Sequence, residues 1–118
     1  MIFIVDDDDG ARASLRVLLE CEGWEAREFA SCREFLDAVK PGEGACLILD
    51  VHMPGMSGLE LLEIMRRGGN MLPVIIVTGR LDAAASGRGR AAGVLAVVEK
   101  PYRADEILRP LEEALGQR

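Results

Sequence analysis

The sequence is short of features that mark several large classes of protein. Its 118 residues are only 4% aromatic, include a single histidine and carry a net charge of −6, which argues against direct nucleic-acid binding. No apolar run approaches the roughly 20 residues of a membrane-spanning helix, and nothing resembles a signal peptide. Because Cys21, Cys32 and Cys46 lack CxxC spacing, we expect reduced, mostly buried thiols rather than a zinc site or a disulfide. These absences predict a cytoplasmic chain without membrane contact.

The apolar residues that are present fall into short runs separated by helical patterns. Continuous runs of Ile, Val and Leu, without alternation, are typical of strands covered on both faces. The runs predict strands at Ile2–Val5, Trp24–Phe29, Cys46–Leu49, Pro73–Val77 and Leu95–Val98. Because a helical pattern follows each run, residues 1–118 are expected to form one α/β domain with a doubly wound parallel sheet and right-handed crossovers.

The helical patterns have recognisable ends. Capping boxes, in which a Ser precedes a Glu by three residues, begin at Ser31 and Ser57. The fourth helix is expected to be poor, because Gly87 and Gly89 interrupt it and each costs about 1 kcal/mol relative to Ala. Helices are expected at Ala11–Glu20, from Ser31 to about Val39, from Ser57 to Gly68-Gly69, at Asp82–Ala92, and from about Arg103 to Leu115.

Polar side chains stand where the predicted strands end, which is the edge at which such sheets bind ligands. Asp6 and Asp7 follow the first strand, Asp50 the third, Thr78 ends the fourth, and Lys100 follows the fifth. Carboxylates can hold a hard divalent cation, and one of them can act as a nucleophile. A hydroxyl and an ammonium can bind phosphoryl oxygens. The set therefore predicts phosphoryl chemistry assisted by a metal.

Four consecutive carboxylates, Asp6 to Asp9, raise a question of charge. Two like charges about 4 Å apart near a protein surface repel by roughly 4 kcal/mol. We expect Asp8 and Asp9 to cap the first helix and occupy its first turn, where the positive end of the helix dipole favours them. Asp6 and Asp7 then remain as the candidate metal ligands among the four aspartates.

Four segments, "IVDDDD", "LILDVHMPGMSGLEL", "VIIVTG" and "VVEKPY", occur in an order and spacing that resemble a response-regulator receiver domain of two-component signalling. The resemblance covers nearly the whole chain and is most like the FixJ type of nitrogen-fixation regulators. It implies a flavodoxin-like (βα)5 fold with strand order 2-1-3-4-5. It also implies a transcription-regulating phosphorelay in which a sensor histidine kinase or a phosphotransfer protein supplies the phosphoryl group.

The resemblance implies roles for individual residues. The chain would catalyse only its own phosphorylation and dephosphorylation, so we do not expect an enzyme acting on other substrates. The implied roles are Asp50 as phosphoacceptor, Asp6, Asp7, Asp50 and the backbone carbonyl of His52 as Mg²⁺ ligands, Thr78 as switch hydroxyl, and Lys100, before a cis bond to Pro101, as phosphate ligand.

Departures from the family pattern concern the output of the domain. Val97 stands where receivers usually carry an aromatic residue, and the fourth helix contains two glycines. Gly79 and Arg80 follow the switch hydroxyl and are expected to move with it. The resemblance also implies that Arg80 and His52 border the path of the water that attacks the phosphoryl group. The resemblance also implies a homodimer through the face of the fourth helix, fifth strand and fifth helix.

Two other functions remain open on the residues alone. A phosphorylation-independent interaction module could share the fold, because the departures at Val97 and the fourth helix affect the readout of the switch. A phosphatase of the haloacid dehalogenase type would need an Asp two residues after its nucleophile, where this chain has His52. Taken singly, Thr78 could be a plain strand residue and Lys100 a plain surface lysine.

Overall fold

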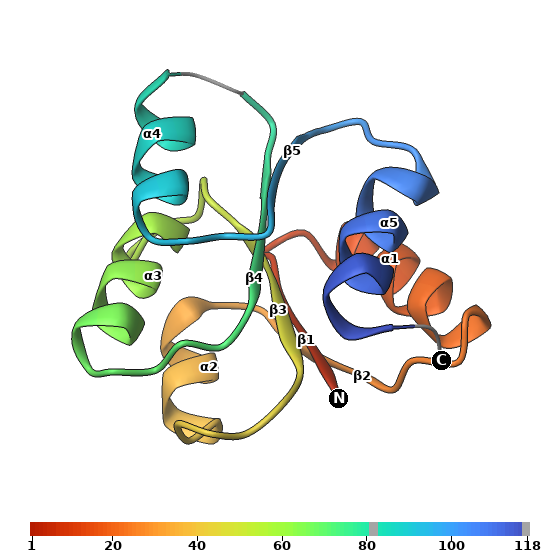
Figure 1. Cartoon of the computed structure of the whole chain (residues 1–118), viewed down its shortest axis with the longest axis horizontal. Helices are drawn as coiled ribbons and strands as arrows, with labels where there is room; N and C mark the ends of the chain where they lie inside the picture. Colours follow the sequence, from red (N-terminus) through yellow and green to blue (C-terminus); the bar gives the residue numbers. More distant parts are fainter. Residues whose placement is uncertain (81–82, 117–118) are drawn as a thin grey trace.

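The computed structural model describes residues 1–80 and 83–116 and confirms the predicted architecture. Its five parallel strands are ordered β2-β1-β3-β4-β5 and alternate with five helices (Figure 1). The strands are β1 (Ile2–Val5), β2 (Ala26–Phe29), β3 (Cys46–Asp50), β4 (Val74–Thr78) and β5 (Ala96–Glu99). The helices are α1 (Asp9–Cys21), α2 (Cys32–Ala38), α3 (Gly58–Arg67), α4 (Ala83–Ala91) and α5 (Ala104–Leu115). In the described part of the chain, none of these helices has the length and apolar character needed to cross a membrane.

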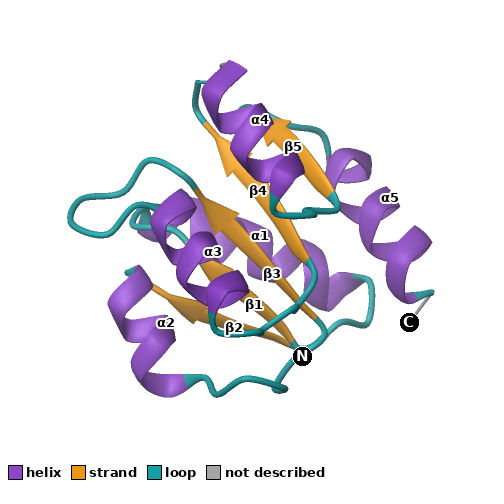
Figure 2. Ribbon diagram, turned by 60° about the vertical axis from the view of Figure 1, so that its left-hand side comes forward, coloured by secondary structure: helices purple, strands orange, loops and turns teal. Residues whose placement is uncertain are grey.

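Helices cover both faces of the sheet, which explains the continuous apolar strands. Helices α1 and α5 lie on one face, and α2, α3 and α4 lie on the other (Figures 1 and 2). Successive strand side chains point to opposite faces. Ile2 and Ile4 of β1 therefore join the core under α1 and α5, and Phe3 and Val5 join the core under α2 to α4.

Strand register brings the predicted site residues to one edge of the sheet. Val5, the last residue of β1, is paired with Leu49 of β3. Asp6 and Asp50, which follow these two residues, therefore lie side by side. Asp50 is in turn paired with Val77, the neighbour of Thr78. Lys100 follows Glu99, the partner of Thr78. Its peptide bond to Pro101 is cis, as the resemblance implied.

Several predicted boundaries shift by one or two residues. β2 begins at Ala26 rather than Trp24, because the buried Trp24 donates its N–H to Leu19 of α1 and closes the turn. Strand β3 extends one residue further than expected and includes Asp50, whereas β4 and β5 each begin and end one residue later than expected and so include Thr78 and Glu99. Cys32 and Cys46 are buried as predicted, but Cys21, in the last turn of α1, is exposed.

The helix caps mostly agree with the sequence. The Asp8 side chain accepts the N–H groups of Gly10 and Ala11 and caps α1, and Asp9 is in its first turn. Ser57 and Glu60 form a complete capping box on α3. The Ser31 side chain accepts the Glu34 N–H at the start of α2, as predicted for its half of the box.

The expectation that Gly87 and Gly89 interrupt the fourth helix is wrong. Helix α4 runs through both glycines from Ala83 to Ala91, whereas Asp82, where the prediction began, lies outside the described residues. A Cβ on Gly89 would lie 2.8 Å from Ile76 Cδ1 and 3.4 Å from Val97 Cγ2. The absence of a side chain at Gly89 thus lets α4 approach β4 and β5 closely, which favours the helix despite its poor intrinsic propensity.

Candidate functional site

Three carboxylates meet at the carboxyl edge of the sheet. Asp6, Asp7 and Asp50 each offer an oxygen, and these oxygens lie within 4.8 Å of one another. Asp6 and Asp50 are 7% and 6% exposed, whereas Asp7 is open to solvent. Their all-oxygen donor set, partly open to water, is the kind that suits a hard cation such as Mg²⁺.

Lys100 balances the two buried carboxylates. Its Nζ lies 2.9 Å from Asp6 Oδ2, where it donates a hydrogen bond, and 3.5 Å from Asp50 Oδ2. Burial alone would lower the pKa of Lys100, but Asp6 and Asp50 outweigh burial and the pKa is raised. The ammonium therefore stays charged and reduces the repulsion between the two acids.

Asp50 is a buried carboxylate whose charge is affected by its neighbours. Burial, followed by the charge of Asp6, raises its pKa, and Lys100 and the N–H of His52 oppose that rise. The His52 N–H donates to Asp50 Oδ1 over 3.3 Å, so the loop after β3 orients the carboxylate. The His52 side chain itself is exposed, in agreement with its interpretation as a loop residue beside the acceptor.

The hydroxyl of Thr78 is engaged within its own turn. Thr78 is fully buried, and its Oγ1 donates to the Arg80 carbonyl over 2.9 Å and accepts the Arg80 N–H over 3.1 Å. Gly79 lies between them with no atom within 4 Å of where a Cβ would be. The sequence thus places Thr78 correctly on the edge, and a hydroxyl that turned toward Asp50 would give up two bonds to Arg80.

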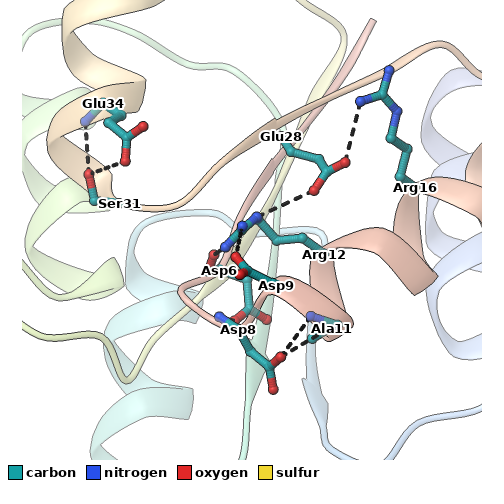
Figure 3. Close-up of polar contacts among 10 residues, drawn as sticks. Asp6, Asp8, Asp9, Ala11, Arg12, Arg16, Glu28, Ser31 and Glu34 are labelled. Carbon is teal, nitrogen blue, oxygen red and sulfur yellow. Dashed lines mark hydrogen bonds and ion pairs between the residues drawn. The ribbon is translucent and has the colours of Figure 1, made fainter.

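Two residues near the site were not singled out from the sequence. The Arg12 guanidinium donates to the carbonyl of Asp6 and pairs with Asp9 and Glu28 (Figure 3). Gly58 packs against the main chain of Asp50. For Arg12, the available signal in the sequence was its three-residue spacing from Asp9 on a helix. For Gly58, the signal was a glycine at the first position of a capped helix, where a better helix former is expected.

This edge, with its acids and lysine on a 2-1-3-4-5 parallel sheet, defines a class of signalling domain. The model of the response regulator receiver domain family matches residues 2–112. The chain therefore belongs to that family and is a receiver domain of a two-component response regulator.

Named relatives agree with this assignment. The chain is 36% identical over 116 residues to the transcriptional regulatory protein FixJ of Azorhizobium caulinodans, covering 98% of this chain and 55% of that protein. It matches the structure of response regulator StyR with a TM-score of 0.90 and 35% identity, over 97% of this chain and 58% of the other. Chemotaxis protein CheY4 of Vibrio cholerae matches with a TM-score of 0.86 and 26% identity over 97% of each chain. The chain spans about half the length of the curated relatives it matches.

Proposed function

We propose that this domain accepts one phosphoryl group on Asp50 from the phosphohistidine of a partner histidine kinase or phosphotransfer protein. The convergence of Asp50 with Asp6, Asp7 and Lys100 at the end of β3 is the observation that carries the proposal. In the transfer, an Asp50 carboxylate oxygen forms a bond to phosphorus while the P–N bond of the donor histidine breaks. The product is an aspartyl phosphate that alters the contacts of the domain.

The residues around Asp50 have distinct parts in this reaction. The His52 N–H orients the Asp50 carboxylate, and Lys100, 3.5 Å from it, is placed to pair with the incoming phosphoryl oxygens. Thr78 would exchange its bonds to Arg80 for a phosphoryl oxygen. That exchange would draw Gly79 and Arg80 toward the site and carry the change to α4.

A divalent cation fits the same edge. Asp6, Asp7 and Asp50 would hold Mg²⁺ together with the backbone carbonyl of His52. When bound, Mg²⁺ would offset the negative charge of the acids and of the transferring phosphoryl group. Asp6 would then share its carboxylate between the cation and Lys100, the residue that pairs with it in this structure.

The proposal makes the protein a switch rather than an enzyme with a substrate of its own. Its catalytic power would serve only the gain and loss of its own phosphoryl group. We place it in the cytoplasm, in keeping with three free thiols. A homodimer through α4, β5 and α5 stays a prediction, as does regulation of transcription through a further domain like those of its longer relatives.

Labelling with a small phosphodonor separates this proposal from its alternatives. The chain would be incubated with acetyl phosphate and Mg²⁺ while intact mass and released phosphate are followed in time. Incorporation that stops at one phosphate per chain supports the switch. Sustained, rapid turnover of donor would indicate a phosphatase, and a lack of any incorporation would indicate a phosphorylation-independent interaction module.

A further inference from the structure

Arg12 of α1 lies outside the acid cluster and contacts the main chain of one of its members, Asp6. One guanidinium nitrogen donates to the carbonyl oxygen of Asp6 over 2.6 Å, another pairs with Asp9, and Nε lies 3.3 Å from Glu28 Oε1 (Figure 3). Its side chain is only 12% exposed. Such a fork of donors, meeting three acceptors at once, is a geometry that Arg forms and Lys does not.

The contact with Arg12 completes a set of restraints on Asp6. The Asp6 N–H donates to the Phe29 carbonyl, Oδ1 accepts the Asp8 N–H over 2.9 Å, and Oδ2 accepts from Lys100 over 2.9 Å. The carbonyl bond to Arg12 fixes the peptide that follows β1, which is the peptide that sets the direction of the turn into α1. Loss of that bond would leave the Asp6 carbonyl without this partner, and Asp6 would be held only by its N–H bond to Phe29 and its two side-chain bonds.

Arg12 is itself held by a second strand. Glu28 of β2 contacts Arg12 through one oxygen and Arg16, one turn further along α1, through the other, each over 3.3 Å. Burial would lower the pKa of Arg12, but Asp9 and Glu28 outweigh burial and raise it, so the guanidinium remains charged. The two arginines thus share one carboxylate, yet Arg12 is the one that also reaches Asp6.

The charge of Arg12 and its hydrogen bonds have opposite consequences for a cation bound by Asp6. A positive charge beside the acids repels a cation, so its removal would tighten cation binding by Coulomb's law. A bond that orients a ligand residue favours cation binding, and its loss commonly weakens metal affinity by about 10-fold or more. The sign of the change on substitution therefore tells which effect prevails.

We propose that Arg12 is a positioning residue that holds Asp6 in the orientation needed to bind the divalent cation, and that this effect outweighs the repulsion by its charge. The inference rests on the proposed function, since it assigns Asp6 to the cation. The inference assigns a role to Arg12, which lies outside the acid cluster. Through Arg12 and Glu28, contacts between α1, the end of β1 and β2 help to hold Asp6 in place.

The test compares Arg12→Lys, Arg12→Met and Arg16→Met with the wild-type chain. Arg16→Met is the matched control, because it removes the same charge from the same helix and the same partner without touching Asp6. Mg²⁺ alone is titrated by calorimetry. Amide NMR spectra of the metal-free proteins are recorded alongside, because the Asp8 N–H, bonded to Asp6 Oδ1, reports the orientation of Asp6.

We expect Arg12→Lys and Arg12→Met to bind Mg²⁺ about 10-fold more weakly, and Arg16→Met to bind within about twofold of wild type or more tightly. The Asp8 amide should shift in both Arg12 variants without Mg²⁺ and stay in place in Arg16→Met. Unchanged or tighter binding in the Arg12 variants, or an equal loss in Arg16→Met, would overturn the inference. If Arg12→Met does not fold, the charge-conserving Arg12→Lys decides alone. Wild-type protein that fails to bind Mg²⁺ would overturn the metal assignment itself.

Discussion

Gly58 lies directly against the main chain of Asp50. A Cβ at Gly58 would be 2.3 Å from the Asp50 carbonyl oxygen, and the Gly58 N–H donates to the Val51 carbonyl over 3.0 Å. The first turn of α3 is thereby docked on the end of β3, next to the proposed phosphoacceptor. Because the opposing atom belongs to the backbone, it cannot move aside as a flexible side chain would.

Gly58→Ala should accordingly lower the free energy of unfolding by about 1–3 kcal/mol, the usual range for overpacking. It should also slow phosphoryl incorporation, because the strand end that carries Asp50 must shift. Urea unfolding and labelling by acetyl phosphate measure the two effects. Stability and labelling rate both equal to wild type would show that the close approach is not needed.

The two glycines of α4 should respond to substitution in opposite ways. Gly87 has no atom within 4 Å of the position that a Cβ would occupy, so Gly87→Ala should stabilise the protein by up to about 1 kcal/mol. Gly89→Ala should destabilise it, because the new methyl would lie 2.8 Å from Ile76 Cδ1. Ile76→Val removes that atom, so Gly89→Ala should be less harmful in the Ile76→Val background. Thermal unfolding of Gly87→Ala, Gly89→Ala, Ile76→Val and the Gly89→Ala/Ile76→Val double variant tests this. Equal effects of the substitutions at Gly87 and Gly89 would refute the packing explanation.

The order of α4 is predicted to change with the state of Asp50. Among the described side chains of α4, only Ala85 contributes a buried apolar group to the core. Polar contacts add to its attachment, namely the Arg66 bond to the Ala92 carbonyl over 2.8 Å and the Arg88 pair with Glu63. Amide hydrogen exchange over residues 83–92 should be fast without phosphorylation and should change with Mg²⁺ and beryllofluoride, a phosphoryl mimic. Strong protection in the free protein, or no response to the mimic, would refute the prediction.

The thiols offer a prediction about pH. Burial, followed by the charges of Asp50 and Glu60, raises the pKa of Cys32 to about 11, and burial raises the pKa of Cys46 to about 12. In the unfolded chain these thiols ionise near the ordinary value of 9.0. Because the folded state binds these protons more tightly, stability is unaffected by the thiols below pH 9 and falls as pH rises toward the folded-state values.

Two measurements check the thiol prediction. At pH 8 a thiol reagent should modify Cys21 alone in the folded protein, and Cys21→Ser should abolish the reaction. The free energy of unfolding should fall above pH 9, and Cys32→Ala with Cys46→Ala should flatten that fall. Rapid modification of two or three thiols in the native protein would contradict the burial of Cys32 and Cys46.

The α/β class and the position of the acid cluster could be predicted from the sequence because they depend on local patterns, whereas the strand order 2-1-3-4-5 was implied by the family resemblance. Continuous apolar runs such as Ile2–Val5 report a buried strand without knowledge of its neighbours. Asp6, Asp50, Thr78 and Lys100 follow or end such strands, and parallel strands bring their ends to one edge. These residues could be placed at the edge of the sheet from the sequence of strands and helices along the chain, without any knowledge of side-chain packing.

The parts that were missed depend on contacts between distant segments. Arg12 reaches Glu28 because β1 and β2 pair in a register that sets Ile4 beside Glu28. The close approach of Gly89 to Ile76 favours α4, whereas helix propensity counts each glycine only as a penalty. Neither relationship has a signature within a short window of sequence.

The central claim is that Asp50 accepts the phosphoryl group with the help of a divalent cation. Intact mass spectrometry of wild type, Asp50→Asn and Asp37→Asn after incubation with acetyl phosphate tests it most directly. Asp37→Asn is the matched control, because Asp37 is an exposed aspartate on α2, away from the acid cluster. We predict one added phosphate in wild type and Asp37→Asn with Mg²⁺, and none in Asp50→Asn or with excess chelator. Incorporation that persists in Asp50→Asn, or that is unaffected by chelator, would contradict the account.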